Sequence, residues 1–279
     1  MSCPFLWKFF MKNQLISNRL NVNAGIMSWY VKELQKLTQQ MTKECKQELA
    51  KIYKKGYPQI AFDESISSQA RIALNQLYDK YSDKFTKRSK TLVKSLLRKT
   101  NRYSNNQINT ALKMMLGASA KDFILKGSAI SPEKSEIMKA LIFENVSLIR
   151  SIPNEYFKQI TGSVARSIEN GEGIKRLVQD LNSYGAKTNR RAQLIAQDQT
   201  RKAYNSINLR NFQENGIRKF KWLHSGGSRD PREYHKNVLN GQIFDIDKGA
   251  PNEKGDGYIY PGQEPYCRCI MQAVLDFED

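Results

Sequence analysis

The sequence has 279 residues, and its 45 lysines and arginines against 27 acidic residues give a net charge of +18. Hydrophobic residues make up 40% of the sequence, which excludes a wholly disordered chain. No apolar run approaches the roughly 18 residues of a membrane span. The four scattered cysteines do not form a disulfide framework, so a reducing compartment is expected. The excess of positive charge predicts a polyanionic partner, with nucleic acid first and an anionic membrane second, and a basic protein with no such partner is the alternative.

The first 26 residues show no periodic pattern. We expect them to be poorly ordered, because a chain end without such a pattern is seldom held by the rest of a fold. Met27, where a regular helical pattern begins, is an alternative translation start. The aromatic opening has no charged segment before it and no small-residue cleavage site after it, so a secretory signal is not expected.

Long helices are predicted for residues 27–130. From Trp29 to Lys55, apolar residues recur every three or four positions, as on one face of a helix, and Cys45 lies on this stripe as a core residue. A second helix is predicted to begin near Asp63, with an apolar face that continues to about Leu97, and a third covers Asn105 to Gly117. This part shows no strand pattern and no catalytic motif.

These helices carry most of the positive charge. Residues 1–130 hold 23 basic and 8 acidic side chains, against 22 and 19 in residues 131–279, so we expect a basic helical domain (27–130) and a second domain (131–279). One stretch of these helices holds eight basic residues and no acidic one. The basic residues recur at helical spacing, which suits contact with phosphates. The alternative is an ordinary solvated helix face. The predicted DNA-binding residues are Lys84, Lys87, Arg88, Lys90, Lys94, Arg98, Lys99 and Arg102.

The second domain opens with a helix-start pattern at residues 131–133. Its serine can cap a helix, its proline suits the first turn, and its glutamate suits the positive end of the helix dipole. Further helices with clear ends are predicted at Tyr156–Glu169, from Ile174 to a stop at Gly185, and at Thr188–Glu214, which Asn215-Gly216 closes.

The pattern changes to strands after residue 216. Ile217–His224 alternates as a half-buried strand does, Asn240-Gly241 is a hairpin signal, and residues 258–262 and 267–274 are strand-like. Between them, Asp230 is predicted to cap a short helix. The fold class is therefore mainly α in the N-terminal region, with long basic helices, followed by a helical plus small β-rich (α+β) C-terminal domain.

The order of motifs in this domain resembles one known family. A long helix leads to a strand with tryptophan, then to "RDPREYHKNVLNG", to "YPG" and to "CRC". This order, over about residues 155–275, is similar to that of the phage Mu protein F-like family, the minor head or head morphogenesis proteins of tailed phages. The segment "AQDQTR" departs from the family's "A-R-T-E". The matched positions are Asn205, Gly216, Trp222, Asp230, Arg232, His235, Leu239, Gly241, Pro261, Gly262, Cys267, Arg268 and Cys269.

The resemblance implies a minor capsid protein. A few copies would associate with the portal during prohead assembly and remain inside the head near the DNA. The expected partners are the portal protein, scaffold or capsid proteins and double-stranded DNA, with no membrane partner. The expected locations are the host cytoplasm during assembly and then the virion. Structural roles are expected for Trp222, Asp230, Arg232, Gly241, Pro261 and Gly262.

Cys267 and Cys269 stand two positions apart, so in an extended segment both thiols face one side. Their Cα atoms would then be about 6.5–7 Å apart, at or beyond the range of an unstrained disulfide. Together with His235 they could hold one structural zinc ion, with His224 as a fourth ligand and Asp230 as a further oxygen donor. The alternative is that both cysteines are packed core residues and His235 is a hydrogen-bonded turn residue.

Two other functional classes compete with a structural head protein. One is a metal-dependent nuclease or hydrolase that uses Asp230, His235, the cysteine pair, Asp245 and Asp247. The other is a membrane-surface protein that uses the basic helices and the aromatic N-terminus. We expect no enzymatic activity and no catalytic residue, because the sequence shows no nucleophile with an adjacent base and an oxyanion site.

Overall fold

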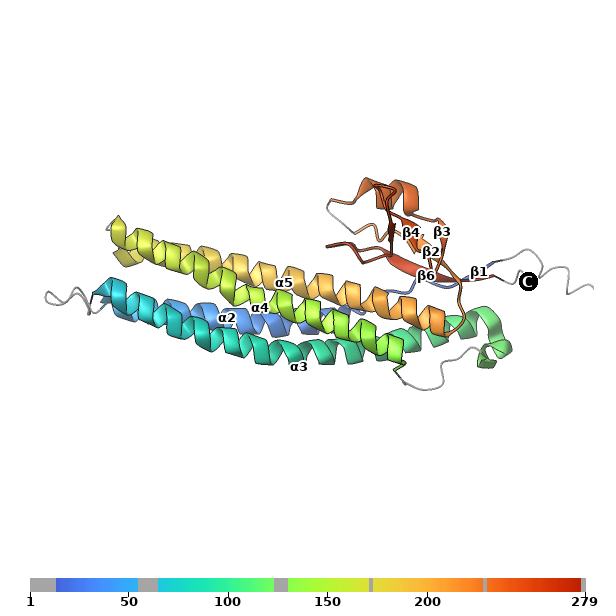
Figure 1. Ribbon diagram of the computed structural model, residues 1–279, viewed down its shortest axis with the longest axis horizontal. Helices are drawn as coiled ribbons and strands as arrows, with labels where there is room; N and C mark the ends of the chain where they lie inside the picture. The colour runs from blue at the N-terminus through green and yellow to red at the C-terminus, as the bar shows by residue number, and fades with distance from the viewer. Residues whose placement is uncertain (1–13, 55–64, 123–129, 171–172, 228–229, 277–279) are drawn as a thin grey trace, which may run out of the picture. The chain divides into compact units, whose positions relative to one another are not determined.

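The computed structural model describes residues 14–54, 65–122, 130–170, 173–227 and 230–276. Long helices come first and a small β-rich part comes last, which confirms the predicted fold class (Figure 1). None of the described helices combines the length and the apolar composition that crossing a membrane requires. The helices are α2 (Ala24–Lys54), α3 (Ile66–Leu116), the short 3-10 helix η2 (Gly117–Asp122), α4 (Pro132–Glu169) and α5 (Gly173–Glu214).

The chain divides into two compact units, each assembled from separated segments. The helical unit consists of Met27–Leu96 and Ala140–Gln197, and the sheet unit contains residues 14–26, Leu97–Lys139 and the part of the chain from Asp198 onward. Because α3, α4 and α5 contribute to both units, these units do not follow the predicted domain boundary at residue 130. The division into sequence domains stays a prediction.

The helical unit has the apolar stripe of α2 in its core. Tyr30 on this stripe donates a hydrogen bond from its hydroxyl to Asn145 of α4 at 2.9 Å, and Thr38 donates to Asn189 of α5 at 3.0 Å. The stripe therefore faces two neighbouring helices, as its period predicted. Its buried residues are Tyr30, Leu34, Leu37, Thr38, Met41, Cys45 and Leu49, so the prediction of Cys45 as a core residue is confirmed.

Three predicted helix boundaries do not occur. The second and third predicted helices are one helix, α3. α4 passes through Pro153 instead of starting afresh at Tyr156, and α5 passes through Gly185, where a stop was predicted. A Cβ added at Gly185 would lie 3.5 Å from Thr42 of α2. The helix is thus packed against its neighbour at this point, and packing compensates for the cost of about 1 kcal/mol of a glycine inside a helix.

Other predicted helix ends are confirmed. The hydroxyl of Ser131 accepts a hydrogen bond of 3.1 Å from the backbone N–H of Lys134 and so caps α4. At the end of α5, Gly216 has a φ of 71°, and the N–H of Ile217 donates to the carbonyl of Phe212 at 2.9 Å. This is the bonding pattern of a Schellman cap, which a glycine permits.

The sheet unit contains an antiparallel sheet with the strand order β1-β6-β2-β3 (Figure 1). β2 buries Phe220 and Trp222 on one face and leaves its lysines half-exposed, so the predicted alternation is confirmed. A second small sheet pairs β4 with β5. The strands are β1 (Leu15–Ile16), β2 (Lys219–Leu223), β3 (Ile243–Asp245), β4 (Ala250–Pro251), β5 (Tyr258–Ile259) and β6 (Ile270–Leu275).

The segment before α2 is held by the sheet. Leu15 of β1 stands opposite Leu275 of β6, and the N–H of Ser17 donates to the carbonyl of Ala273 at 2.9 Å. Leu20 is buried in the apolar core of the unit. The prediction of poor order is therefore wrong for residues 14–26, because the partner strand lies far along the sequence and no local pattern reports it. Residues 1–13 lie outside the described residues.

Candidate metal centre

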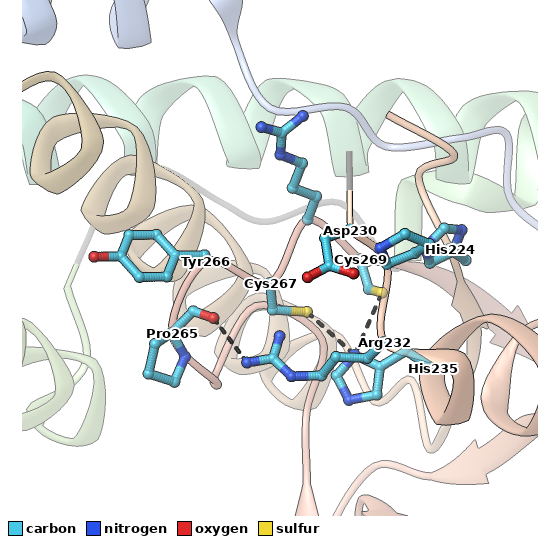
Figure 2. A pocket seen from close by; sticks show the side chains of 10 residues that line it. His224, Asp230, Arg232, His235, Pro265, Tyr266, Cys267 and Cys269 are labelled. Carbon is cyan, nitrogen blue, oxygen red and sulfur yellow. Dashed lines mark hydrogen bonds between the residues drawn. The ribbon is translucent and has the colours of Figure 1, made fainter. Parts of the chain in front are cut away.

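Three of the predicted metal ligands come together in the sheet unit. His235 lies in the short π-helix η3 (Tyr234–Leu239), and Cys267 and Cys269 lie in the segment directly before β6. Nδ1 of His235 is 3.7 Å from Sγ of Cys267 and 3.8 Å from Sγ of Cys269 (Figure 2). The three donor atoms lie within 4.8 Å of one another, all three residues are buried, and neither cysteine forms a disulfide.

The C-terminal part of α5 positions the cysteine segment. Its Asp198 accepts a hydrogen bond of 2.5 Å from the backbone N–H of Tyr266, a residue held at a φ of 60°. Its Asn205 donates to the carbonyl of Cys269 at 3.2 Å. These contacts fix the backbone on both sides of Cys267, so the direction of the two thiols does not depend on the cysteines themselves.

The far side of the histidine ring is held as firmly. Nε2 of His235 lies 2.9 Å from a carboxylate oxygen of Glu264. The Arg232 guanidinium lies 3.4 Å from the same oxygen and donates to the carbonyl of Pro265 at 3.0 Å (Figure 2). The ring of Trp222 stands edge-on to the imidazole at a centroid distance of 5.0 Å. The imidazole is therefore oriented with Nδ1 toward the sulfurs.

The two thiols share a hydrogen bond that separates their acidities. The Cys269 thiol lowers the pKa of Cys267 by hydrogen bonding, and the same bond together with burial raises the pKa of Cys269. A cation bound at the two sulfurs would favour loss of both thiol protons.

The other predicted ligands lie nearby but outside the group of three. His224 and Asp230 line a cavity of about 450 Å³ together with His235 and both cysteines (Figure 2). Nδ1 of His224 accepts a hydrogen bond of 3.2 Å from Gly226. Asp230 does not cap η3, because the residue before that helix is Glu233. The structure thus brings three predicted ligands into contact and leaves two on the cavity wall.

Two glycines in this unit serve the backbone. Gly241, at a φ of 85°, turns the chain from η3 into β3, and its N–H donates to the carbonyl of Trp222 at 2.8 Å. The predicted hairpin at Asn240-Gly241 is therefore wrong, since the glycine follows a helix. Gly262 has a φ of 77° beside the buried Pro261 and faces Asn205 of α5. Both glycines occupy the left-handed region, which other residues adopt at a cost.

The two aspartates considered for a nuclease, Asp245 and Asp247, take part in the hydrogen bonding of a turn. Asp245 accepts hydrogen bonds from the backbone N–H groups of Asp247 (2.8 Å) and Lys248 (3.2 Å). Asp247 accepts a further hydrogen bond of 2.9 Å from Gln213. In the part of the chain that the structure describes, neither aspartate joins a group of three metal donors.

The predicted DNA-binding residues lie along α3. Lys87 pairs with Asp83 at 2.7 Å, and Arg88 pairs with Glu33 at 2.9 Å, while Lys84 donates to Gln40. Contact with DNA stays a prediction. The exposed members of the set are Lys87, Arg88, Lys90, Lys94, Arg98, Lys99 and Arg102, and Lys84 is half-buried.

Residues 158–272 match the family described as "Phage Mu protein F like protein". This segment is therefore similar to that family. The Mu F-like segment includes α5, β2, η3 and the group of His235, Cys267 and Cys269, so the resemblance predicted for about residues 155–275 is confirmed.

A relative outside the family match extends the similarity to most of the chain. An uncharacterized protein of Haemophilus influenzae (strain ATCC 51907 / DSM 11121 / KW20 / Rd) is 27% identical over 255 residues, which cover 89% of this chain and 53% of that protein. The chain thus spans about half the length of this relative. No solved structure matches the chain.

Sequence reasoning missed two residues of the site. Glu264 lies only three positions before Cys267, and a carboxylate next to a ligand pair is a recognisable signal, because metal-bound histidines commonly hydrogen-bond a carboxylate. Asp198, which holds Tyr266, gives no such signal. Its role depends on packing between α5 and a segment almost seventy positions later.

Proposed function

We propose that this protein is a minor head protein of a tailed phage or prophage that takes part in head morphogenesis. The observation that carries this proposal is the family match over residues 158–272. The alignment with the H. influenzae protein covers 89% of the chain, which supports treating the preceding helices and the Mu F-like segment as parts of one working protein.

In this proposal a few copies associate with the portal while the prohead assembles in the host cytoplasm, together with scaffold or capsid proteins. They then remain in the virion and touch the packaged DNA. The net charge of +18 supports the DNA contact, as does the row of exposed cations on α3. Such cations bind phosphates without reading sequence, as a protein that lies against a packaged genome requires.

The protein's role in this proposal is structural. A metal-dependent nuclease would need carboxylates that hold catalytic cations, but Asp245 accepts backbone hydrogen bonds in a turn and Asp247 accepts a hydrogen bond from the side chain of Gln213. His235 and the cysteines are buried, and α5, Glu264 and Arg232 hold the segments that carry them. These contacts favour a structural role for this group of residues over a catalytic one.

The test is assembly of proheads with and without the protein, using the portal, scaffold and capsid proteins of the same phage or prophage. We expect a few copies per particle to sediment with proheads and to be retained by immobilised portal. Glu136→Gln, an exposed change on α4, serves as the matched control and should be incorporated normally. Proheads and packaged particles that form in normal yield without the protein, and that contain none of it when it is present, would refute the proposal.

A further inference from the structure

We propose that His235, Cys267 and Cys269 bind one zinc ion, which fastens η3 to the segment before β6. This inference does not depend on the proposed function, because it uses only the arrangement of side chains in the sheet unit.

The donor distances fit a zinc ion. Tetrahedral zinc holds a thiolate at about 2.3 Å and an imidazole nitrogen at about 2.0–2.1 Å, which places these two donors roughly 3.5–3.6 Å apart. The two distances from Nδ1 of His235 to the sulfurs are 3.7 and 3.8 Å. A ring nitrogen has one in-plane site for a hydrogen bond, so hydrogen bonding accounts for one of these contacts but not for two nearly equal ones. A cation between the three atoms accounts for both.

The surroundings of the histidine fit a metal ligand as well. Nε2 of His235 lies 2.9 Å from Glu264, so the proton of a neutral imidazole belongs on Nε2 and the lone pair of Nδ1 faces the sulfurs. In zinc sites, the ring N–H of a histidine ligand commonly donates a hydrogen bond to a carboxylate, which fixes the tautomer and the ring orientation. Arg232, 3.4 Å from the same carboxylate, holds Glu264 in turn.

The donor set selects zinc over harder cations. Two thiolates and an imidazole suit zinc, whereas magnesium and calcium prefer oxygen donors. The fourth ligand comes from the cavity side, where His224 and Asp230 line the wall beside both sulfurs (Figure 2). The ion would close the loop between His235 and Cys269, which are 34 positions apart and enclose β3, β4 and β5. Binding would therefore stabilise this part of the fold.

The test uses the full-length protein purified after expression with zinc in the medium, with the metal measured by mass spectrometry. We expect one zinc per chain. Cys267→Ser should hold less than about a tenth of that amount. Removal of a residue that only hydrogen-bonds a metal ligand weakens metal affinity about 10–100-fold, and removal of a direct ligand should weaken it more. Cys45→Ala, which changes a buried free cysteine of the helical unit, is the matched control and should keep its zinc.

A second variant keeps the proposal testable if Cys267→Ser does not fold. Glu264→Gln preserves all three donors and should weaken zinc binding about 10–100-fold in competition with a chelator, whereas Glu253→Gln, an exposed change in the same unit, should not. X-ray absorption of the zinc-loaded protein should show two sulfur neighbours. A protein without stoichiometric zinc, a metal without sulfur neighbours, or unchanged affinity in Glu264→Gln would overturn the proposal.

Discussion

The side-chain amide of Asn205 fills the space in which any Cβ at position 262 would stand. A Cβ added to Gly262 would lie 2.3 Å from Nδ2 of Asn205. The same amide donates hydrogen bonds to the carbonyls of Arg201 (3.1 Å) and Cys269 (3.2 Å). The absence of a side chain at position 262 thus allows α5 to hold the cysteine segment directly through its backbone.

Gly262→Ala is expected to destabilise the protein by about 2–5 kcal/mol. The left-handed backbone accounts for about 1–2 kcal/mol, and the clash with Asn205 adds the cost of overpacking, about 1–3 kcal/mol. Urea unfolding measures the change. Gly255→Ala is the matched control, since Gly255 has a φ of 75° with no atom near its missing Cβ, and it should show only the first cost. Equal losses in the two variants would contradict the close approach.

Leu20→Ala is expected to lower the free energy of unfolding by about 2–5 kcal/mol, the usual cost of emptying a buried leucine site. Leu20 is 3% exposed and belongs to the core of the sheet unit. Ile16→Ala, four positions earlier at 39% exposure, should change stability far less. If both variants match the unchanged protein in urea unfolding, residues 14–26 are not held as described.

Glu214→Gln is expected to cost about 3–5 kcal/mol, because it leaves a buried cation without its partner. The Lys134 ammonium lies 2.5 Å from the Glu214 carboxylate, and the side chain of Lys134 is 1% exposed. The control is Glu136→Gln, whose partner Lys139 is 67% exposed. An exposed pair contributes little, so thermal unfolding should shift clearly for the first variant alone. Similar shifts would show that burial does not govern the first pair.

Glu44 predicts a pH dependence of the helical unit. Hydrogen bonds from Lys80 and Tyr81 lower the pKa of Glu44 below its ordinary value of 4.5. Stability from this carboxylate is complete above the ordinary value and is lost as the pH falls through the lowered one. Glu44→Gln should therefore be less stable at about pH 7, and the difference should shrink towards about pH 3. Glu48→Gln, whose partner Lys51 is 66% exposed, is the control. A difference independent of pH would contradict the assignment.

Non-specific duplex DNA should bind through the cations of α3. Changing Lys90, Lys94, Arg98 and Arg102 to glutamine should weaken binding to all sequences alike and flatten the dependence of log Kobs on log salt by about 0.9 for each phosphate that the variant no longer neutralises. Fluorescence anisotropy across a salt series measures both effects. The matched control removes four exposed cations of α4 and α5. Its residues are Arg150, Lys158, Lys175 and Arg190.

That control decides between two origins of the affinity. If it weakens binding as much as the α3 variant does, the overall charge binds DNA and the predicted row has no special role. Unchanged binding in the α3 variant would remove the support that the predicted cations give to DNA contact.

The sequence predicted the helical elements well where periodicity alone decides them. The stripe from Leu34 to Leu49 on α2 is buried at the predicted positions, because amphipathic spacing reflects one packed face. The sequence did not predict that α5 continues through Gly185. A glycine ends a helix only if nothing else holds the next turn, and the holding contact with Thr42 comes from a different helix.

The sequence predicted the ligands of the candidate site but not the residues that hold those ligands in place. The two-residue spacing of Cys267 and Cys269 predicted thiols on one side, and the family resemblance added His235. Spacing could have indicated Glu264, which lies three positions before Cys267, but not Asp198, which acts on a residue brought near by tertiary packing. The same reason explains β1, a two-residue strand whose partner is β6.

The position of β6 has a consequence for synthesis of the protein on the ribosome. β6 lies between β1 and β2, so the strand made last joins two strands that have no other link within the sheet. The helical unit uses residues only up to Gln197 and can pack while later residues are still being added. The edges of β1 and β2 stay unpaired until Ile270–Leu275 emerges, since closing so long a loop must await its final strand. A chain that stops short of β6 therefore leaves the facing edges of β1 and β2 unpaired, which invites aggregation, and only a chain completed through Leu275 joins the four strands into one sheet.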